Sequence, residues 1–281
     1  MTPLDHCAAL VAEADPDRFR SAMTAPVTGR ARLLPLYAAF AEIARAPWVS
    51  QEPMIGLMRL QFWQDGLGEI CAGRPPRAHP VMEALAPVVA DAGLEVDGFE
   101  TVIAARRSDR DPAHPADTAA LHAYLEGSAA KPMELAVRVL SDAQVVSTAR
   151  DAALAAAQGI GFASGAANLL RALPALAARG VLPLPELGRS DLAALLDGRT
   201  TTALADAIGG LGAQAHARHR AGLAAARSAP RVVYPALRSG WRAGWLLRRA
   251  CRGGDVLRDL GSESEFRRRA GLAWRELTGR V

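Results

Sequence analysis

Apolar residues recur every three or four positions through almost the whole of this chain, and this spacing limits the folds open to it. Such spacing places apolar side chains on one face of an α-helix, and no stretch shows the alternation typical of a strand. Composition agrees, because Ala and Leu dominate while β-branched and aromatic residues are sparse. Without a long flexible gap, the pattern predicts one all-α domain over residues 1–281, a bundle of about ten helices.

The predicted helices are separated by proline, glycine and polar connections. They cover residues 29–45, 50–71, 79–91, 97–107, 118–140, 145–173, 202–227, 234–251 and 263–277. We expect Ser50 to be an N-cap and Pro132 to kink its helix. Pro174 is expected to end the helix that covers residues 145–173. In the second helix, Met58, Phe62 and Leu67 are expected to face the core.

Charge and cysteine usage argue against several classes of protein and site. Lys and Arg exceed Asp and Glu by a net charge of +4, and Lys131 is the only lysine, which gives no argument for nucleic acid as a partner. Cys7, Cys71 and Cys251 are odd in number and far apart, so neither a disulfide framework nor a cysteine zinc site is expected. No signal peptide and no run of about 18 apolar residues is visible, so we expect a reduced, cytoplasmic, soluble protein.

Four blocks stand out together in the sequence. They are YAAFAEIA at 37–44, EPMIGLMRLQFWQD at 52–65, AQGIGFASGAANLLR at 157–171 and RGVLPLP at 179–185. Their order and spacing resemble the squalene/phytoene synthase family over residues 15–227. The resemblance implies an isoprenoid-synthase-like bundle of helices around a central cavity, in which that family joins two prenyl diphosphates.

The resemblance also implies a metal clamp, and the sequence departs from it. In that family, carboxylates spaced i, i+4 on two facing helices hold Mg²⁺ against the leaving diphosphate. The clamp should fall at 44–48 and 172–176, where this chain has Ala-Arg-Ala-Pro-Trp and Ala-Leu-Pro-Ala-Leu, and Glu42 is the nearest acid. We therefore expect no catalytic residue, no metal site and no cofactor; Mg²⁺ would be needed only if the chain were an active prenyltransferase.

Two other groups of titratable residues could be sites. Asp255 and Asp259 have i, i+4 spacing but lie far from the clamp positions, so a solvated helix face is the expectation. His216 and His219 have i, i+3 spacing without an acid or cysteine nearby, so we expect a surface pair and not a zinc site.

Gly159, Gly161 and Gly165 form a G-x-G-x-x-x-G string inside a helical pattern. A dinucleotide-binding glycine motif follows a strand, which this string does not. Close packing between helices is therefore the expected role of these glycines.

Nine residues of the family-like blocks are candidates for lining the cavity or contacting a partner. They are Tyr37, Phe40, Glu42, Arg59, Gln61, Trp63, Asp65, Asn168 and Arg171. For Arg59 the alternative is a buried structural arginine paired with Glu42 or Asp65, which would avoid an unpaired buried charge.

The segment 234–251 combines tryptophan with arginine. Leu237, Trp241 and Trp245 recur at four-residue spacing, and Arg238 and Arg242 lie on an adjoining face. One interpretation is contact with a membrane surface or a membrane-protein partner, since both side-chain types suit the headgroup boundary. The other is a bundle helix whose tryptophans lie in the core. Burial of the tryptophans distinguishes the two.

Two stretches resemble one branch of the family. They are GLMRLQFWQD at 56–65 and AQAHARHRAGLAAAR at 213–227, and the branch is an assembly factor of respiratory complex I that also lacks the aspartate clusters. This resemblance implies a non-catalytic protein that is peripheral at the inner membrane and whose partners are membrane-arm subunits of complex I or other assembly factors. Two alternatives remain: an active prenyltransferase of isoprenoid or carotenoid synthesis, and a carrier that binds an isoprenoid lipid.

Overall fold

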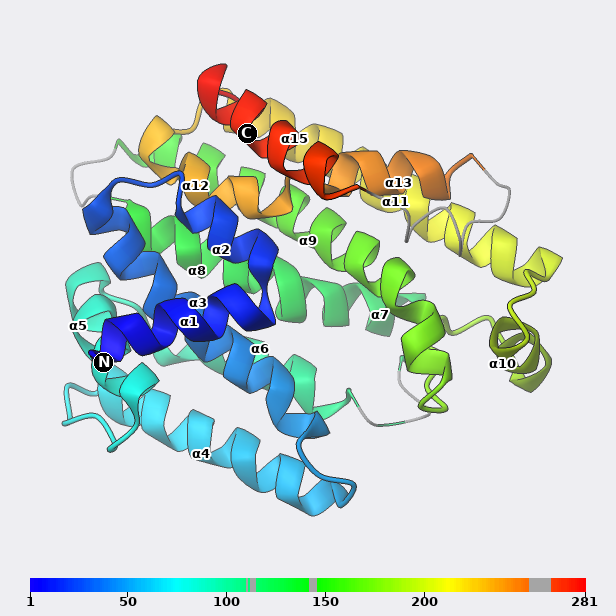
Figure 1. Cartoon of the computed structure of the whole chain (residues 1–281), viewed down its shortest axis with the longest axis horizontal. Coiled ribbons are helices and arrows are strands. Elements are labelled where there is room, and N and C mark those ends of the chain that lie inside the picture. The colour runs from blue at the N-terminus through cyan, green and yellow to red at the C-terminus, as the bar shows by residue number, and fades with distance from the viewer. Residues whose placement is uncertain (110, 112–114, 142–145, 253–263) are drawn as a thin grey trace.

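The computed structural model describes residues 1–109, 111, 115–141, 146–252 and 264–281, and these form helices without a strand (Figure 1). The α-helices are α1 (Pro3–Ala14), α2 (Pro16–Ala22), α3 (Val27–Arg45), α4 (Pro53–Cys71), α5 (Pro80–Ala92), α6 (Val96–Arg107), α7 (Thr118–Leu125), α8 (Lys131–Leu140), α9 (Ser147–Ala177), α10 (Arg189–Leu196), α11 (Thr202–Ala226), α12 (Tyr234–Leu237), α13 (Ala243–Ala250) and α15 (Glu265–Leu277). Short turns of other helix types are η1 (Ala46–Trp48), η2 (Glu126–Ala130), η3 (Arg231–Val233) and η4 (Arg238–Gly240). The predicted all-α class is confirmed; α1, α2 and α10 were not predicted.

Helix α9 is the central helix and joins the two parts of the core. Ala156 and Ile160, on its N-terminal half, belong to a cluster with side chains of α1, α3, α5 and α8. Ala163 and Leu170, on its C-terminal half, belong to a second cluster with α11 and α13. By length and mean hydropathy (1.2), α9 could cross a membrane, but 61% of its most apolar window is buried inside the bundle.

The glycine string of α9 allows close helix packing, as predicted. A Cβ on Gly159 would lie 2.6 Å from the carbonyl oxygen of Arg218 in α11, and one on Gly161 would lie 2.6 Å from the Cα of Ala130 in η2. Real side chains do not fit at such distances, so glycine at these positions lets the backbones approach.

The predicted helix 118–140 is interrupted one turn earlier than Pro132. Residues 126–130 form a π-helical turn, η2, and Pro132 lies in the first turn of α8, where a missing N–H costs little. The wide turn brings Ser128 and Ala129 to the wall of the cavity described below.

Three predicted helix ends differ from the structure. Glu52 and not Ser50 is the N-cap residue of α4; the Ser50 hydroxyl accepts a hydrogen bond from the Glu52 N–H (3.1 Å). Helix α9 continues through Pro174 to Ala177. The segment 234–251 is divided into α12, η4 and α13, and a Cβ on Gly240 would lie 2.4 Å from Oγ of Ser164, so the break coincides with a close approach to α9.

The buried face of α4 is also not the predicted one. Leu60 and Trp63 are buried with Leu67, whereas Met58 is 66% exposed and Phe62 is 37% exposed. Helix α4 is apolar on both sides, so helical spacing alone does not identify the side that packs. The close approach of Gly56 to Pro47 in η1 fixes the orientation, since a Cβ there would lie 3.0 Å from the Pro47 Cα.

Candidate functional site

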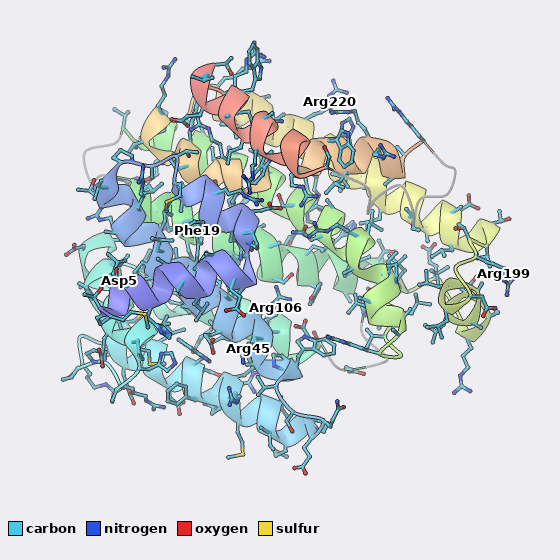
Figure 2. The ribbon with its side chains drawn as sticks, viewed as in Figure 1. Asp5, Phe19, Arg45, Arg106, Arg199 and Arg220 are labelled. Atoms are coloured by element: carbon cyan, nitrogen blue, oxygen red, sulfur yellow. The ribbon has the colours of Figure 1, made fainter. Side chains whose placement is uncertain are left out.

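Two adjoining cavities lie between α9 and the N-terminal helices. The larger, here called the main cavity, has a volume of about 540 Å³, and the smaller, the side cavity, about 220 Å³. Both are lined by Asp15, Arg18, Gly165 and Asn168, so they share one wall. The main cavity also contacts the C-terminal ends of α3 and α6, and Arg45 and Arg106 from these ends are labelled in Figure 2.

The two segments expected to carry the metal clamp meet at the main cavity. Ala44 and Trp48 line it from α3 and η1, and Ala172 and Leu176 line it from α9. The structure therefore brings together the positions that the resemblance singled out, with apolar side chains in place of carboxylates. Nothing at these four positions fits Mg²⁺, which prefers oxygen ligands.

The carboxylates of the main cavity are Asp15 and Asp109, and each has an arginine beside it. Arg18 lies 3.6 Å from Asp15, and Arg106 lies 3.3 Å from Asp109. The hydroxyl of Tyr124 donates a 2.8 Å hydrogen bond to Asp109, and burial raises the pKa of Tyr124 to about 12, so it remains a donor at neutral pH. Both carboxylates are thus held in ion pairs.

Four arginines line the main cavity, which gives its polar part a positive balance. Besides Arg18 and Arg106 they are Arg45, whose side chain is 70% exposed and 3.7 Å from Glu42, and Arg179, whose guanidinium lies 4.8 Å from the Trp48 ring centroid. The remaining wall includes Phe40, Leu125 and Leu169. The arrangement suits a molecule with an apolar body and a polar or anionic end.

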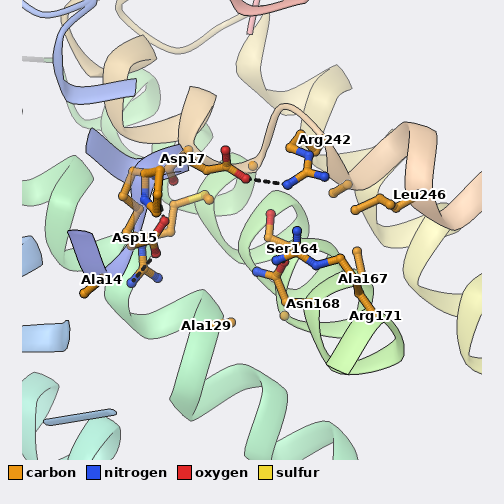
Figure 3. A pocket seen from close by; sticks show the side chains of 17 residues that line it. Ala14, Asp15, Asp17, Ala129, Ser164, Ala167, Asn168, Arg171, Arg242 and Leu246 are labelled. Carbon is orange, nitrogen blue, oxygen red and sulfur yellow. Dashed lines mark hydrogen bonds and ion pairs between the residues drawn. The ribbon is translucent and has the colours of Figure 1, made fainter. Parts of the chain in front are cut away.

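The side cavity is more polar than the main cavity, and several of its polar side chains pair with one another (Figure 3). Asp17 and Arg242 form a 2.7 Å ion pair across it, with Arg242 buried. On α9, Arg171 donates a 3.3 Å hydrogen bond to the side-chain oxygen of Asn168. The first pair joins α2 to the start of α13, and the second lies within α9.

The candidates from the first and third blocks are partly brought together. Phe40 lines the main cavity, Asn168 lines both cavities and Arg171 lines the side cavity. Tyr37 is buried behind these walls, where burial raises the pKa of its hydroxyl, and Glu42 lies beside Arg45 outside the lining.

The candidates from the second block do not line either cavity. Arg59 is exposed, so the interpretation as a buried arginine is wrong. Asp65 accepts a 2.7 Å hydrogen bond from Gln61 and lies 3.6 Å from Arg77. Trp63 is 3% exposed and packs edge-on against the His79 ring, with centroids 5.2 Å apart. A partner site on this helix remains a prediction.

The segment 234–251 belongs to the core. Trp241 is 5% exposed, Trp245 is half-buried, and Arg238 and Arg242 are both buried. Helix α15 covers this segment: Arg238 donates to the Arg280 carbonyl oxygen (2.8 Å) and pairs with Glu276. Burial contradicts membrane contact for Trp241, Arg238 and Arg242 and confirms the core interpretation for Trp241, whereas Trp245 is only half-buried.

His219 is buried against α13 and not at the surface as predicted. A Cβ on Gly244 would lie 2.7 Å from Cε1 of His219, and burial lowers the pKa of His219 to about 4, with His216 contributing. Among the described residues, no group of three or more His, Cys, Asp or Glu side chains could hold a metal ion. Asp255 and Asp259 lie outside the described residues.

Sequence reasoning missed Asp15, Arg18, Arg106, Asp109 and Tyr124 as cavity residues. They come from α2, α6, α7 and the connections that follow α1 and α6, and no motif links these segments. One local signal existed, since an aspartate before a proline suits an N-cap, and Asp15 accepts a 3.0 Å hydrogen bond from the Arg18 N–H at the start of α2.

One family model matches the sequence, and solved structures share the fold. The sequence model of squalene/phytoene synthase matches residues 11–276. A dehydrosqualene synthase crystallised with a ligand superposes with a TM-score of 0.79 at 17% identity, covering 98% of this chain and 96% of that one. The squalene synthase HpnC from Alicyclobacillus acidocaldarius gives 0.67 at 18% identity, with 99% and 94% coverage, and YisP from Bacillus subtilis gives 0.64 at 15%, with 96% and 95%. No curated protein sequence matches the chain.

Proposed function

We propose that this chain, which belongs to the squalene/phytoene synthase family, is a non-catalytic member that acts in the assembly of respiratory complex I. One observation carries the non-catalytic part. Ala44, Trp48, Ala172 and Leu176 occupy the wall of the main cavity where the metal-binding carboxylates of a synthase would be needed.

The remaining acids of the main cavity do not replace that clamp. Asp15 and Asp109 are single carboxylates from different elements, and each is neutralised by an arginine. Ionisation of a prenyl diphosphate requires that the leaving diphosphate be stabilised, and a divalent cation held by several carboxylates supplies this in the family. The cavity is therefore suited to binding and not to that reaction.

The assembly role is supported by the resemblance of residues 56–65 and 213–227 to the complex I assembly branch. The first stretch lies on α4 and shows apolar side chains to solvent, which suits a protein that acts through contacts. Deleting the gene should reduce fully assembled complex I on native gels, and the wild-type gene should restore it. Unchanged complex I would contradict the proposal.

A catalytic assay tests the competing function. Purified protein with Mg²⁺ and farnesyl or geranylgeranyl diphosphate should release no diphosphate above background. Release at a rate that depends on protein concentration would instead establish an active prenyltransferase.

The retained cavity favours one second candidate, binding of an isoprenoid lipid. Its volume and its wall, which combines apolar side chains with four arginines, would suit such a molecule. Mass spectrometry of lipids extracted from purified protein should then find an isoprenoid. Ala172→Phe, which fills the cavity, should remove it, while Ala175→Phe on the exposed side of α9 should not.

A further inference from the structure

The N-terminal half of α4, together with Val49 ahead of the helix, exposes a group of large apolar side chains. This group, here called the apolar tip, consists of Val49, Met54, Ile55, Leu57, Met58 and Phe62, which are 36%, 64%, 38%, 37%, 66% and 37% exposed. The opposite side of the same helix is buried, so these residues are not needed for the core. Large exposed apolar patches on a folded protein mark interaction surfaces.

The apolar tip lies beside the mouth of the main cavity. Trp48, which directly precedes Val49, lines that cavity with Ala44 and Arg45. Helix α4 runs along one edge of the molecule, and its N-terminal end lies next to the C-terminal end of α3 (Figure 1). A partner surface that contacts the apolar tip would therefore lie next to the opening of the main cavity.

Arginines surround the apolar tip. Arg59 is exposed on α4, and Arg45 is 70% exposed at the end of α3. Arg107, exposed at the end of α6, donates hydrogen bonds to Gln61 (3.2 Å) and Gln64 (2.6 Å) of α4. Arg179 lies over Trp48.

Few acids offset this positive charge. Glu52 is exposed at the start of α4, and Glu42 lies beside Arg45. Farther along α4, Asp65 and Glu69 are both paired with Arg77, at 3.6 Å and 2.8 Å. The apolar tip thus has a cationic border.

We propose that the apolar tip docks the protein on a bilayer surface that contains anionic phospholipid. Methionine, leucine, isoleucine and phenylalanine side chains would enter the headgroup–acyl boundary, and the flanking guanidinium groups would contact lipid phosphates. Met54 and Met58, each about two-thirds exposed, line neither cavity, and such projecting side chains suit a deformable lipid surface. This inference goes beyond the proposed function and holds whether the cavity binds a lipid or is empty.

Flotation of the full-length protein with lipid vesicles tests the proposal. Vesicles of phosphatidylcholine mixed with phosphatidylglycerol should retain the wild type, and added salt should weaken retention because it screens the arginines. Met54→Gln with Met58→Gln should weaken apparent affinity about tenfold or more, given the apolar area withdrawn from the lipid. Arg59→Gln with Arg107→Gln should weaken it about tenfold on anionic vesicles and leave any retention on pure phosphatidylcholine unchanged.

The matched control replaces two exposed apolar side chains outside the apolar tip by glutamine. Val27 and Leu196 are 76% and 57% exposed on α3 and α10, away from the apolar tip, and Val27→Gln with Leu196→Gln should bind like the wild type. Far-UV circular dichroism checks that all variants are folded. Three results would overturn the proposal: no retention of the wild type on anionic vesicles, equal retention of the Met54/Met58 variant, or an equal loss in the control.

Discussion

Helix α4 and the α12–α13 segment both carry apolar side chains at helical spacing, but they differ from the predictions in opposite directions. Side chains of α4 that were expected in the core are exposed, and a tryptophan of the α12–α13 segment that could have faced a membrane is buried. On α4, Met58 and Phe62 point to solvent although their spacing suited a core face. On the α12–α13 segment, Trp241 is buried although tryptophan beside arginine suited a membrane-facing surface. Spacing identifies which residues share a face, but not which face receives a neighbour.

The difference follows from what covers each segment. Helix α15 lies over the α12–α13 segment, and a Cβ on Gly271 would lie 3.9 Å from Nε1 of Trp241. Helix α2 adds Asp17 as the partner of Arg242, so an arginine can be buried there. Helix α4 lies at the edge of the bundle, with its inner side on η1 and α6 and its outer side uncovered.

The largest expected effect is at Trp241. Trp241→Ala should lower the free energy of unfolding by about 4 kcal/mol, because a large buried side chain leaves a cavity. Urea denaturation followed by circular dichroism measures this change. A loss below about 1 kcal/mol would mean that this side chain is not buried in solution.

The second effect is a pH dependence from His219 behind α13. Burial holds its folded-state pKa at about 4, below its usual 6.5, so the unfolded chain binds the proton more readily. Stability from this group is present above pH 6.5 and is lost as pH falls toward 4, by about 2–3 kcal/mol.

Urea denaturation at pH 7 and pH 4 checks this effect by comparison. Other groups also titrate in this range, so His219→Gln is the reference: its stability should fall less than that of the wild type. Equal falls in the two proteins would contradict the buried position of His219.

A smaller effect is expected for the buried ion pair that ties α2 to α13. Asp17→Asn should cost about 2 kcal/mol of unfolding free energy, because Arg242 stays buried after losing a charged partner. The exposed Arg59→Gln on α4 should cost less than about 0.5 kcal/mol. If the two variants lose a similar amount of unfolding free energy, α4 and the α12–α13 segment do not differ in how they hold their charged side chains.

Local sequence signals were sufficient for much of the fold. The helical class and the close packing of Gly159 and Gly161 were predicted, because period and glycine spacing are properties of one segment. The break between α12 and α13 was not predicted; it coincides with the close approach of Gly240 to Ser164, 76 positions away in the chain, which local patterns do not show.

Only those cavity residues that belong to a family motif were predicted from the sequence. Phe40, Asn168 and the empty clamp positions lie at the cavities as the resemblance implied. The pairs of Arg18 with Asp15 and of Arg106 with Asp109 are each local, with i, i+3 spacing, but they were missed as cavity residues because only tertiary packing brings the two pairs to one wall.

The smallest expected effect separates the two sides of α4 itself. Met58→Ala should change the free energy of unfolding by less than about 0.5 kcal/mol, because the side chain is already in water. Leu60→Ala, two positions away on the buried side, should cost about 3 kcal/mol. If Met58→Ala instead costs as much as Leu60→Ala, the outer side of α4 is covered in solution, and size-exclusion chromatography of the pair would show whether a second copy covers it. A small Met58 effect on stability, together with a large Met54/Met58 effect on vesicle binding, would assign this face to interaction and not to folding.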